Sequence, residues 1–130
     1  MRGVAIGIDL GTSGIRAALV DARRDVVAMT SARIAAAERN NPDAWWRALR
    51  AAVGALAREA RLVDVESIAV DGTSGTILPV DTAGRPLAPA SLYNAPADPT
   101  DVARVAQVAP PGSAARGAPR HWPAPWPGET

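Results

Sequence analysis

The chain has 130 residues, a formal net charge of +1 and no cysteine. This length allows one domain with its own core, and the near-neutral charge excludes strong electrostatic recruitment to nucleic acid or anionic membranes. The lack of cysteine excludes a disulfide framework and a thiolate metal site, and a single histidine argues against His-based catalysis. No stretch has the length of a transmembrane segment or the pattern of a signal peptide, so we expect a cytoplasmic protein.

Three consecutive strands are predicted at the start of the chain. Apolar runs at 4–9 and 15–21 flank a short polar turn, and 26–33 is a weaker third strand because Ala and Ser dilute it. The connections are short, and the second of them, 21–25, is rich in Asp and Arg. Short turns between successive strands predict an antiparallel meander.

The first turn carries residue types suited to phosphate. Gly11 and Gly14 can adopt positive φ and leave backbone N–H groups uncovered, while Thr12 and Ser13 add hydroxyl donors. Asp9, at the end of the first strand, is placed to hold Mg²⁺ or its waters. The pattern predicts a metal–phosphate site on a hairpin, although the same residue types also form ordinary hairpin turns. It is not a Walker loop, because the chain has no lysine.

A helix is predicted after the meander. Asn41 suits the N-cap, Pro42 the first helical position and Asp43 the positive end of the helix dipole. Apolar side chains then recur at three- and four-residue steps, which predicts one buried face: Trp45, Leu49, Ala52, Val53, Leu56 and Ala60. Trp45 is interpreted as a core residue rather than a ligand platform.

The second half of the chain is predicted to begin with two strands. The apolar run 67–71 is expected to be a buried strand, and 77–80 a fifth strand, followed by a turn at 81–84 and a short extended piece at 91–94. Asp98 should then cap a short helix that runs to about Val108.

The last segment of the sequence has a different character. Between Pro119 and Thr130 proline recurs every two to four residues, which fits neither a helix nor a strand ladder. We therefore expect one domain over 1–118 and a disordered Pro/Trp-rich tail over 119–130.

Two strand ends in the sequence have similar continuations. Asp9 and Asp71 each end a predicted strand, and each is followed by Gly-Thr-Ser-Gly, with Leu10 intervening only in the first. Parallel pairing of these strands across the helix would bring both turns to one edge of the sheet, where α/β proteins commonly bind ligands. A phosphate turn beside a second hydroxyl-rich turn indicates a phosphoryl donor meeting a polyhydroxyl acceptor, with Thr73 and Ser74 suited to sugar hydroxyls.

These motifs resemble a known family. Residues 6–16, Ile-Gly-Ile-Asp-Leu-Gly-Thr-Ser-Gly-Ile-Arg, are similar to the phosphate motif that opens the FGGY carbohydrate kinases. Residues 70–76, 81–87 and 92–94 resemble the xylulose kinase-like branch of that family, especially its ribulose kinases. The resemblance spans about 4–118, with the motifs in the family's order.

The resemblance implies a fold, a reaction and a nucleotide site. The fold is α/β, a partial actin-like, ribonuclease-H-like ATPase fold, and the reaction is ATP-dependent phosphorylation of a pentulose with Mg²⁺. In that family's pattern Asp9 positions Mg²⁺. The ATP phosphates are faced by Gly11, Thr12, Ser13 and Arg16.

On the sugar side, the resemblance assigns Asp71, Gly72, Thr73 and Ser74 to the substrate. Many members of the family continue the Tyr-Asn pair with an Asp and then an Arg, whereas Ala-Pro-Ala follows at 95–97 here. The family's general base is an Asp in a later segment, so no catalytic base is assigned in this chain.

Three functions remain open from the sequence. The first is the N-terminal fragment of a pentulose kinase, inactive alone and truncated or frameshifted after about Ala118. The second is a non-catalytic fragment that binds a partner, such as a separately encoded C-terminal half. The third is an actin-like ATPase of the chaperone or filament type, which the sugar-side motif at 71–76 argues against.

Overall fold

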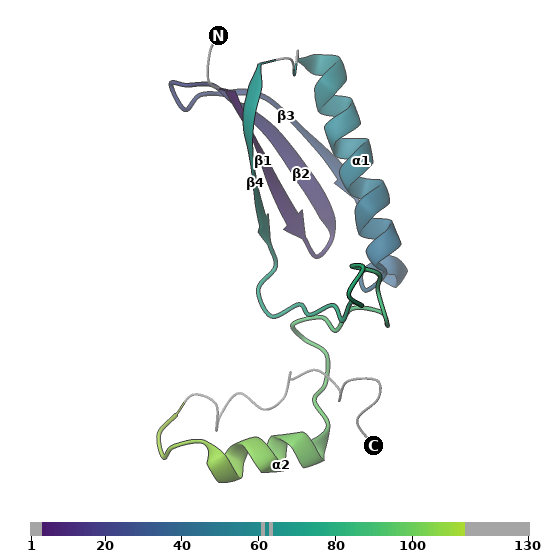
Figure 1. Ribbon diagram of the computed structural model, residues 1–130, viewed down its shortest axis with the longest axis vertical. Coiled ribbons are helices and arrows are strands. Elements are labelled where there is room, and N and C mark those ends of the chain that lie inside the picture. Colours follow the sequence, from purple (N-terminus) through teal and green to yellow (C-terminus); the bar gives the residue numbers. More distant parts are fainter. Residues whose placement is uncertain (1–3, 61, 63, 114–130) are drawn as a thin grey trace. The chain divides into compact units, whose positions relative to one another are not determined.

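The structure of the protein is a computed structural model that describes residues 4–60, 62 and 64–113 (Figure 1). The chain divides into two compact units, the first ending at Thr73 and the second beginning at Ser74. None of the helices in the described residues has the length and apolar character needed to span a membrane.

The first unit is built on a four-stranded sheet with the strand order β3-β2-β1-β4 (Figure 1). Its strands are β1 (Val4–Gly11), β2 (Gly14–Val20), β3 (Val26–Arg33) and β4 (Val65–Gly72). The first three pair antiparallel, and β4 pairs parallel to β1. The predicted meander and the predicted parallel pairing across the helix are both confirmed.

The turn between β2 and β3 is held by one carboxylate. Asp21 Oδ1 accepts hydrogen bonds from the backbone N–H groups of Arg23 and Asp25, at 2.8 and 3.0 Å. Arg24 takes a positive φ of 71°, which allows the tight reversal. Aspartate at the first turn position is favoured for this side chain-to-backbone bonding.

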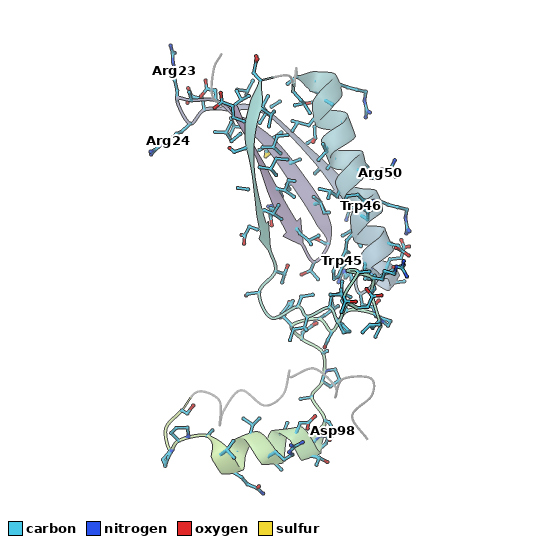
Figure 2. The ribbon with its side chains drawn as sticks, in the orientation of Figure 1. Arg23, Arg24, Trp45, Trp46, Arg50 and Asp98 are labelled. Carbon is cyan, nitrogen blue, oxygen red and sulfur yellow. The ribbon has the colours of Figure 1, made fainter. Side chains whose placement is uncertain are left out.

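Helix α1 (Pro42–Glu59) begins where the sequence predicts, after a short 3₁₀ turn at Ala36–Glu38. The Asn41 side chain accepts a hydrogen bond from the backbone N–H of Asp43 at 3.0 Å, as expected of an N-cap. The Trp45 indole packs against the core and donates to the Arg39 carbonyl at 2.8 Å, whereas Trp46 is 60% exposed (Figure 2).

The buried face of α1 is shifted from the predicted one. Its buried residues follow one i, i+4 row: Ala44, Ala48, Ala52 and Leu56. Trp45, Leu49 and Val53 are only partly buried and flank that row. Alanines in the centre let the helix axis approach the sheet, and the larger side chains close the sides of the contact.

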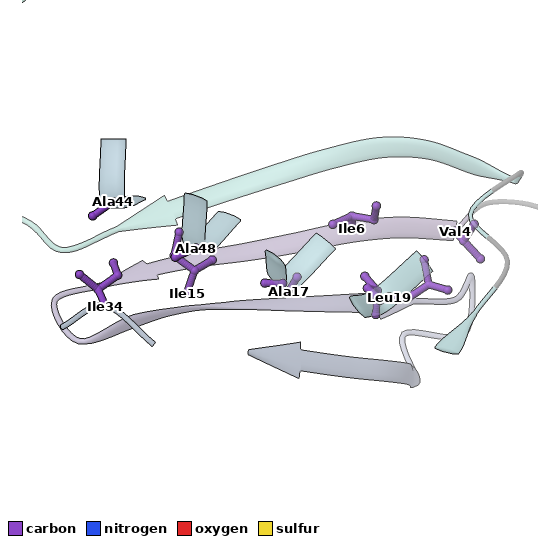
Figure 3. Packing of buried hydrophobic residues seen from close by; sticks show 10 residues of the cluster. Val4, Ile6, Ile15, Ala17, Leu19, Ile34, Ala44 and Ala48 are labelled. Atoms are coloured by element: carbon purple, nitrogen blue, oxygen red, sulfur yellow. The ribbon is translucent and has the colours of Figure 1, made fainter. Parts of the chain in front are cut away.

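The core lies between α1 and one face of the sheet (Figure 3). The helix packs against β2 and β3, whose side chains on this face include the fully buried Ile15 and Leu19. The buried Thr30 hydroxyl donates to the Ala52 carbonyl at 2.8 Å, which satisfies its polar atom inside the core.

The prediction that β4 is buried is wrong. Ile68 and Val70 are 62% and 70% exposed. Their register partners on β1 are Ile6 and Ile8, so they lie on the sheet face that carries α1. The helix packs on β2 and β3, and β4 is the edge strand on the far side of β1. A short apolar run does not reveal which strands the helix covers.

This difference in burial predicts a difference in stability. Ile6 is 4% exposed and its partner Ile68 is 62% exposed, although both are isoleucines on one sheet face. We expect Ile6→Val to lower the free energy of unfolding by about 1 kcal/mol. Ile68→Val should change it by no more than about 0.5 kcal/mol. Urea unfolding followed by circular dichroism measures both, and equal losses would show that β4 is covered.

The second unit contains less regular structure than predicted. The expected strand at 77–80 is absent, and isolated antiparallel bridges pair Ile77 with Ser91 and Val80 with Pro86. Pro79 has no N–H to donate, so a continuous ladder through this segment is interrupted. The extended piece expected at 91–94 is likewise reduced to the bridge at Ser91.

Two other predicted features of the second unit are confirmed. At the 81–84 turn, Asp81 Oδ1 accepts from the N–H groups of Ala83 and Arg85, both at 2.8 Å. Helix α2 (Pro99–Val108) is capped by Asp98, which accepts from Thr100 N–H at 2.7 Å. The predicted tail at 119–130 lies outside the described residues.

Candidate functional site

The ends of β1 and β4 bring the two predicted turns to one edge of the sheet. In the parallel ladder, Asp9 is the register partner of Asp71, and Leu10 is the partner of Gly72. Residues paired in this way present their side chains to the same face of a sheet. Both carboxylates therefore belong to the face opposite α1, since the neighbouring Ile8 and Leu10 pack against the core.

The turn between β1 and β2 is supported from β3. The Ile34 N–H donates to the Ser13 carbonyl at 3.0 Å. A Cβ on Gly14 would lie 2.6 Å from the Ala32 carbonyl oxygen, which is closer than atoms can approach. Gly14 is therefore required by the close approach of β3. Neither Gly11 nor Gly14 has a positive φ, so the left-handed freedom expected from the sequence is not used here.

Threonines connect the two predicted motifs. The hydroxyls of Thr12 and Thr73 lie 3.4 Å apart, within hydrogen-bond distance. Thr73 also donates to the Leu10 carbonyl, from its N–H at 3.1 Å and from its hydroxyl at 3.3 Å. The sequence separates these threonines by 61 residues, yet the fold joins the turn predicted for phosphate to the second Gly-Thr-Ser-Gly motif.

An exposed ion pair lies beside the turn. Arg16 Nη1 is 3.3 Å from Asp9 Oδ2, and the two side chains are 70% and 50% exposed. Pairs this exposed contribute about 0–1 kcal/mol, so an incoming anion or cation can replace either partner at little cost. Arg16 and Asp9 are therefore held together but remain available to a ligand.

A hollow of about 330 Å³ lies at this edge of the sheet. Its lining includes most of the residues predicted for phosphate and metal and three residues of β3. The lining residues are Asp9, Gly11, Ser13, Gly14, Ile15, Arg16, Ser31, Ala32 and Arg33. Sequence reasoning missed the contribution of Ser31 and Arg33. The β2–β3 register, which pairs Gly14 with Arg33 and Arg16 with Ser31, is the signal that would have found them.

The remaining predicted site residues lie at and after the end of β4. The Asp71 carboxylate is exposed and accepts a hydrogen bond from the Gly72 N–H at 2.9 Å. Thr73 closes the first unit, and the exposed Ser74 is the first residue of the second. The structure thus brings Asp71, Gly72 and Thr73 beside the hairpin turn.

The donor set fits a metal-bound phosphate. Within the described residues no three His, Asp or Glu side chains gather around one point. Mg²⁺ in phosphate-transfer sites is usually held by one or two carboxylates together with the phosphates, which Asp9 could provide. Arg16 and the N–H groups of the turn are suited to the phosphate oxygens.

Comparison with known proteins identifies similar chains. Residues 4–104 match the N-terminal domain of the FGGY family of carbohydrate kinases. The xylulose kinase of Escherichia coli K12 is 33% identical over 95 residues, which cover 68% of this chain and 20% of that protein. The chain therefore spans about a fifth of the length of the curated relatives that it matches.

Solved structures show the same architecture. The xylulose kinase from Rhodospirillum rubrum superimposes with a TM-score of 0.68 at 27% identity, covering 82% of this chain and 24% of that one. The xylulose kinase from Bifidobacterium adolescentis gives 0.63 at 25% identity, covering 82% and 20%.

Proposed function

Because the chain belongs to the FGGY family of carbohydrate kinases, we propose that it acts as the N-terminal part of an ATP-dependent kinase for a pentulose. Its sheet and α1 are part of the actin-like, ribonuclease-H-like ATPase fold, as the resemblance predicted. One observation carries the proposal: the parallel β1–β4 pairing, with the Thr12–Thr73 contact, joins the phosphate turn to the predicted sugar-side motif.

In this proposal, the hairpin turn binds the phosphates of ATP. Gly11, Thr12 and Ser13 supply backbone N–H and hydroxyl donors, and Arg16 supplies a guanidinium. The Asp9 carboxylate would hold Mg²⁺, and the bound ion would neutralise charge on the transferred phosphoryl group. Phosphoryl transfer depends mainly on such positioning and electrostatic stabilisation, because the protein contributes little covalent chemistry.

The sugar is proposed to bind on the other side of the same edge. Asp71 and Gly72 end β4, Thr73 and Ser74 follow it, and the Thr73 hydroxyl donates to the Leu10 carbonyl at the start of the turn. Ser74 is exposed and its hydroxyl is the better candidate for a direct contact with the substrate. The similarity to xylulose kinases supports a ribulose- or xylulose-type substrate.

A second candidate function is binding of a partner polypeptide without catalysis by this chain. The exposed Ile68 and Val70 on the edge strand β4 favour it, because apolar side chains on an unpaired edge commonly mark an interaction surface. A separately encoded C-terminal half is the partner that this candidate proposes.

A chimera tests the kinase proposal. Residues 4–104 replace the corresponding segment of the E. coli xylulose kinase, and the product is assayed with ATP, Mg²⁺ and D-ribulose, D-xylulose or L-ribulose. We expect sugar-dependent ATP consumption with at least one pentulose. A chimera with native-like circular dichroism that binds sugar and ATP but transfers no phosphate would contradict the proposal.

The chimera also tests the sugar-side assignment. We expect Ser74→Ala to raise the KM for the pentulose about two- to tenfold, because a lost hydroxyl contact is worth roughly 0.5–1.5 kcal/mol. The KM for ATP should stay the same. Ser67→Ala, which removes an exposed serine hydroxyl elsewhere on β4, is the matched control. An increase in the KM for ATP alone would show that Ser74 contacts the nucleotide and not the sugar.

A further inference from the structure

Positive and negative side chains at this edge of the sheet lie on different strands. On the face opposite α1, the register aligns Ser31, Arg16, Asp9 and Asp71 in one row from β3 to β4. The pairing one step nearer the turn places Arg33 beside Gly14. Positive charge therefore lies on β2 and β3, and negative charge lies on β1 and β4.

Arg33 is held next to the hairpin turn by backbone contacts. A Cβ on Gly14 would lie 3.2 Å from the Arg33 Cα and 2.6 Å from the Ala32 carbonyl oxygen, and the second distance is too short for any residue but glycine. The following residue, Ile34, donates its N–H to the Ser13 carbonyl at 3.0 Å. Arg33 also lines the same hollow as Asp9 and Arg16.

Arg33 differs from Arg16 in its side-chain contacts. Arg16 is paired with Asp9 at 3.3 Å. In the part of the chain that the structure describes, no hydrogen bond or ion pair involves the exposed Arg33 guanidinium. An anion can therefore bind Arg33 without breaking an existing pair.

We propose that Arg33 is a further phosphate-binding residue of this site, which with Arg16 holds the distal phosphates of the nucleotide. A guanidinium offers paired N–H donors that match two phosphate oxygens. This order of charges would orient the bound nucleotide: Arg16 and Arg33 would hold its phosphates on β2 and β3, and Asp9 on β1 would hold the metal. This inference rests on the proposed function, which supplies the nucleotide.

The test is calorimetric titration of the purified chain with magnesium tripolyphosphate, which presents the phosphates without a base or sugar. We expect Arg33→Gln to weaken binding about tenfold, the effect of losing one charge-assisted contact. Arg33→Lys should recover part of the loss, because it keeps the charge but not the planar pair of donors.

Arg23→Gln is the matched control, since it removes the same charge from an exposed arginine at the opposite end of β2 (Figure 2). It should change binding less than twofold. Equal losses of affinity in Arg23→Gln and Arg33→Gln would show that only the net charge of the chain matters, and would overturn the proposal. Wild-type affinity in Arg33→Gln, with Arg16→Gln impaired, would overturn the Arg33 assignment and leave the proposed function standing. No binding by the wild-type chain would contradict both.

Discussion

Purified alone, residues 1–130 should consume no ATP in response to D-ribulose, D-xylulose or L-ribulose. Transfer requires the acceptor hydroxyl, a base, the metal and the γ-phosphate in line. The chain matches about a fifth of the length of its curated relatives, and the resemblance places the base in a later segment. A coupled assay for ADP, with each sugar and without sugar, measures this directly.

The active chimera is the positive control for that assay. Turnover by the chain alone at the rate of an ordinary kinase, about 1–100 per second, would contradict the prediction. The base would then have to be sought among the acidic residues of the described segments, beginning with Asp71, Asp98 and Asp101. Their exposed or half-exposed carboxylates leave each of them accessible to a substrate.

The second large effect concerns Asp9. We expect Asp9→Ala to lower the kcat of the chimera by about 10²–10³-fold, the usual loss when one electrostatic contact to the transition state is removed. The fold should persist, because the ion pair that Asp9 makes with Arg16 is exposed and contributes little stability.

Asp25→Ala is the control for charge, since Asp25 is exposed in the turn at the other end of β2. It should leave kcat unchanged. The loss in Asp9→Ala should also become smaller as the Mg²⁺ concentration is raised, if weakened metal binding is its cause. Full activity in Asp9→Ala would remove Asp9 from the metal site.

Local signals in the sequence predicted most of the first unit. The bounds of β3 match the expected 26–33, and α1 begins at Pro42 after its Asn41 cap. These features depend on short-range chemistry: alternation along a strand, a side chain bonded to nearby backbone, and proline at the first helical turn. The parallel β1–β4 pairing was predicted from the repeated Gly-Thr-Ser-Gly, which is a longer-range signal.

The predictions that were wrong or missing concern features that tertiary packing determines. The apolar run of β4 looks the same whether or not a helix covers it, and α1 packs on β2 and β3 instead. At 77–80, the two bridges leave Pro79 without a ladder around it, although the run is apolar. Arg33 could not be found by motif, because its place in the site depends on the register that Gly14 permits.

The most direct test of the proposed phosphate turn is nuclear magnetic resonance of the isotopically labelled chain. Magnesium tripolyphosphate is titrated in, and adenosine is the control that carries no phosphate. We expect the tripolyphosphate to shift the backbone amide signals of Thr12, Ser13 and the connected Thr73, and adenosine to leave them unchanged. Unmoved signals at this turn, with shifts confined to other parts of the chain, would contradict it.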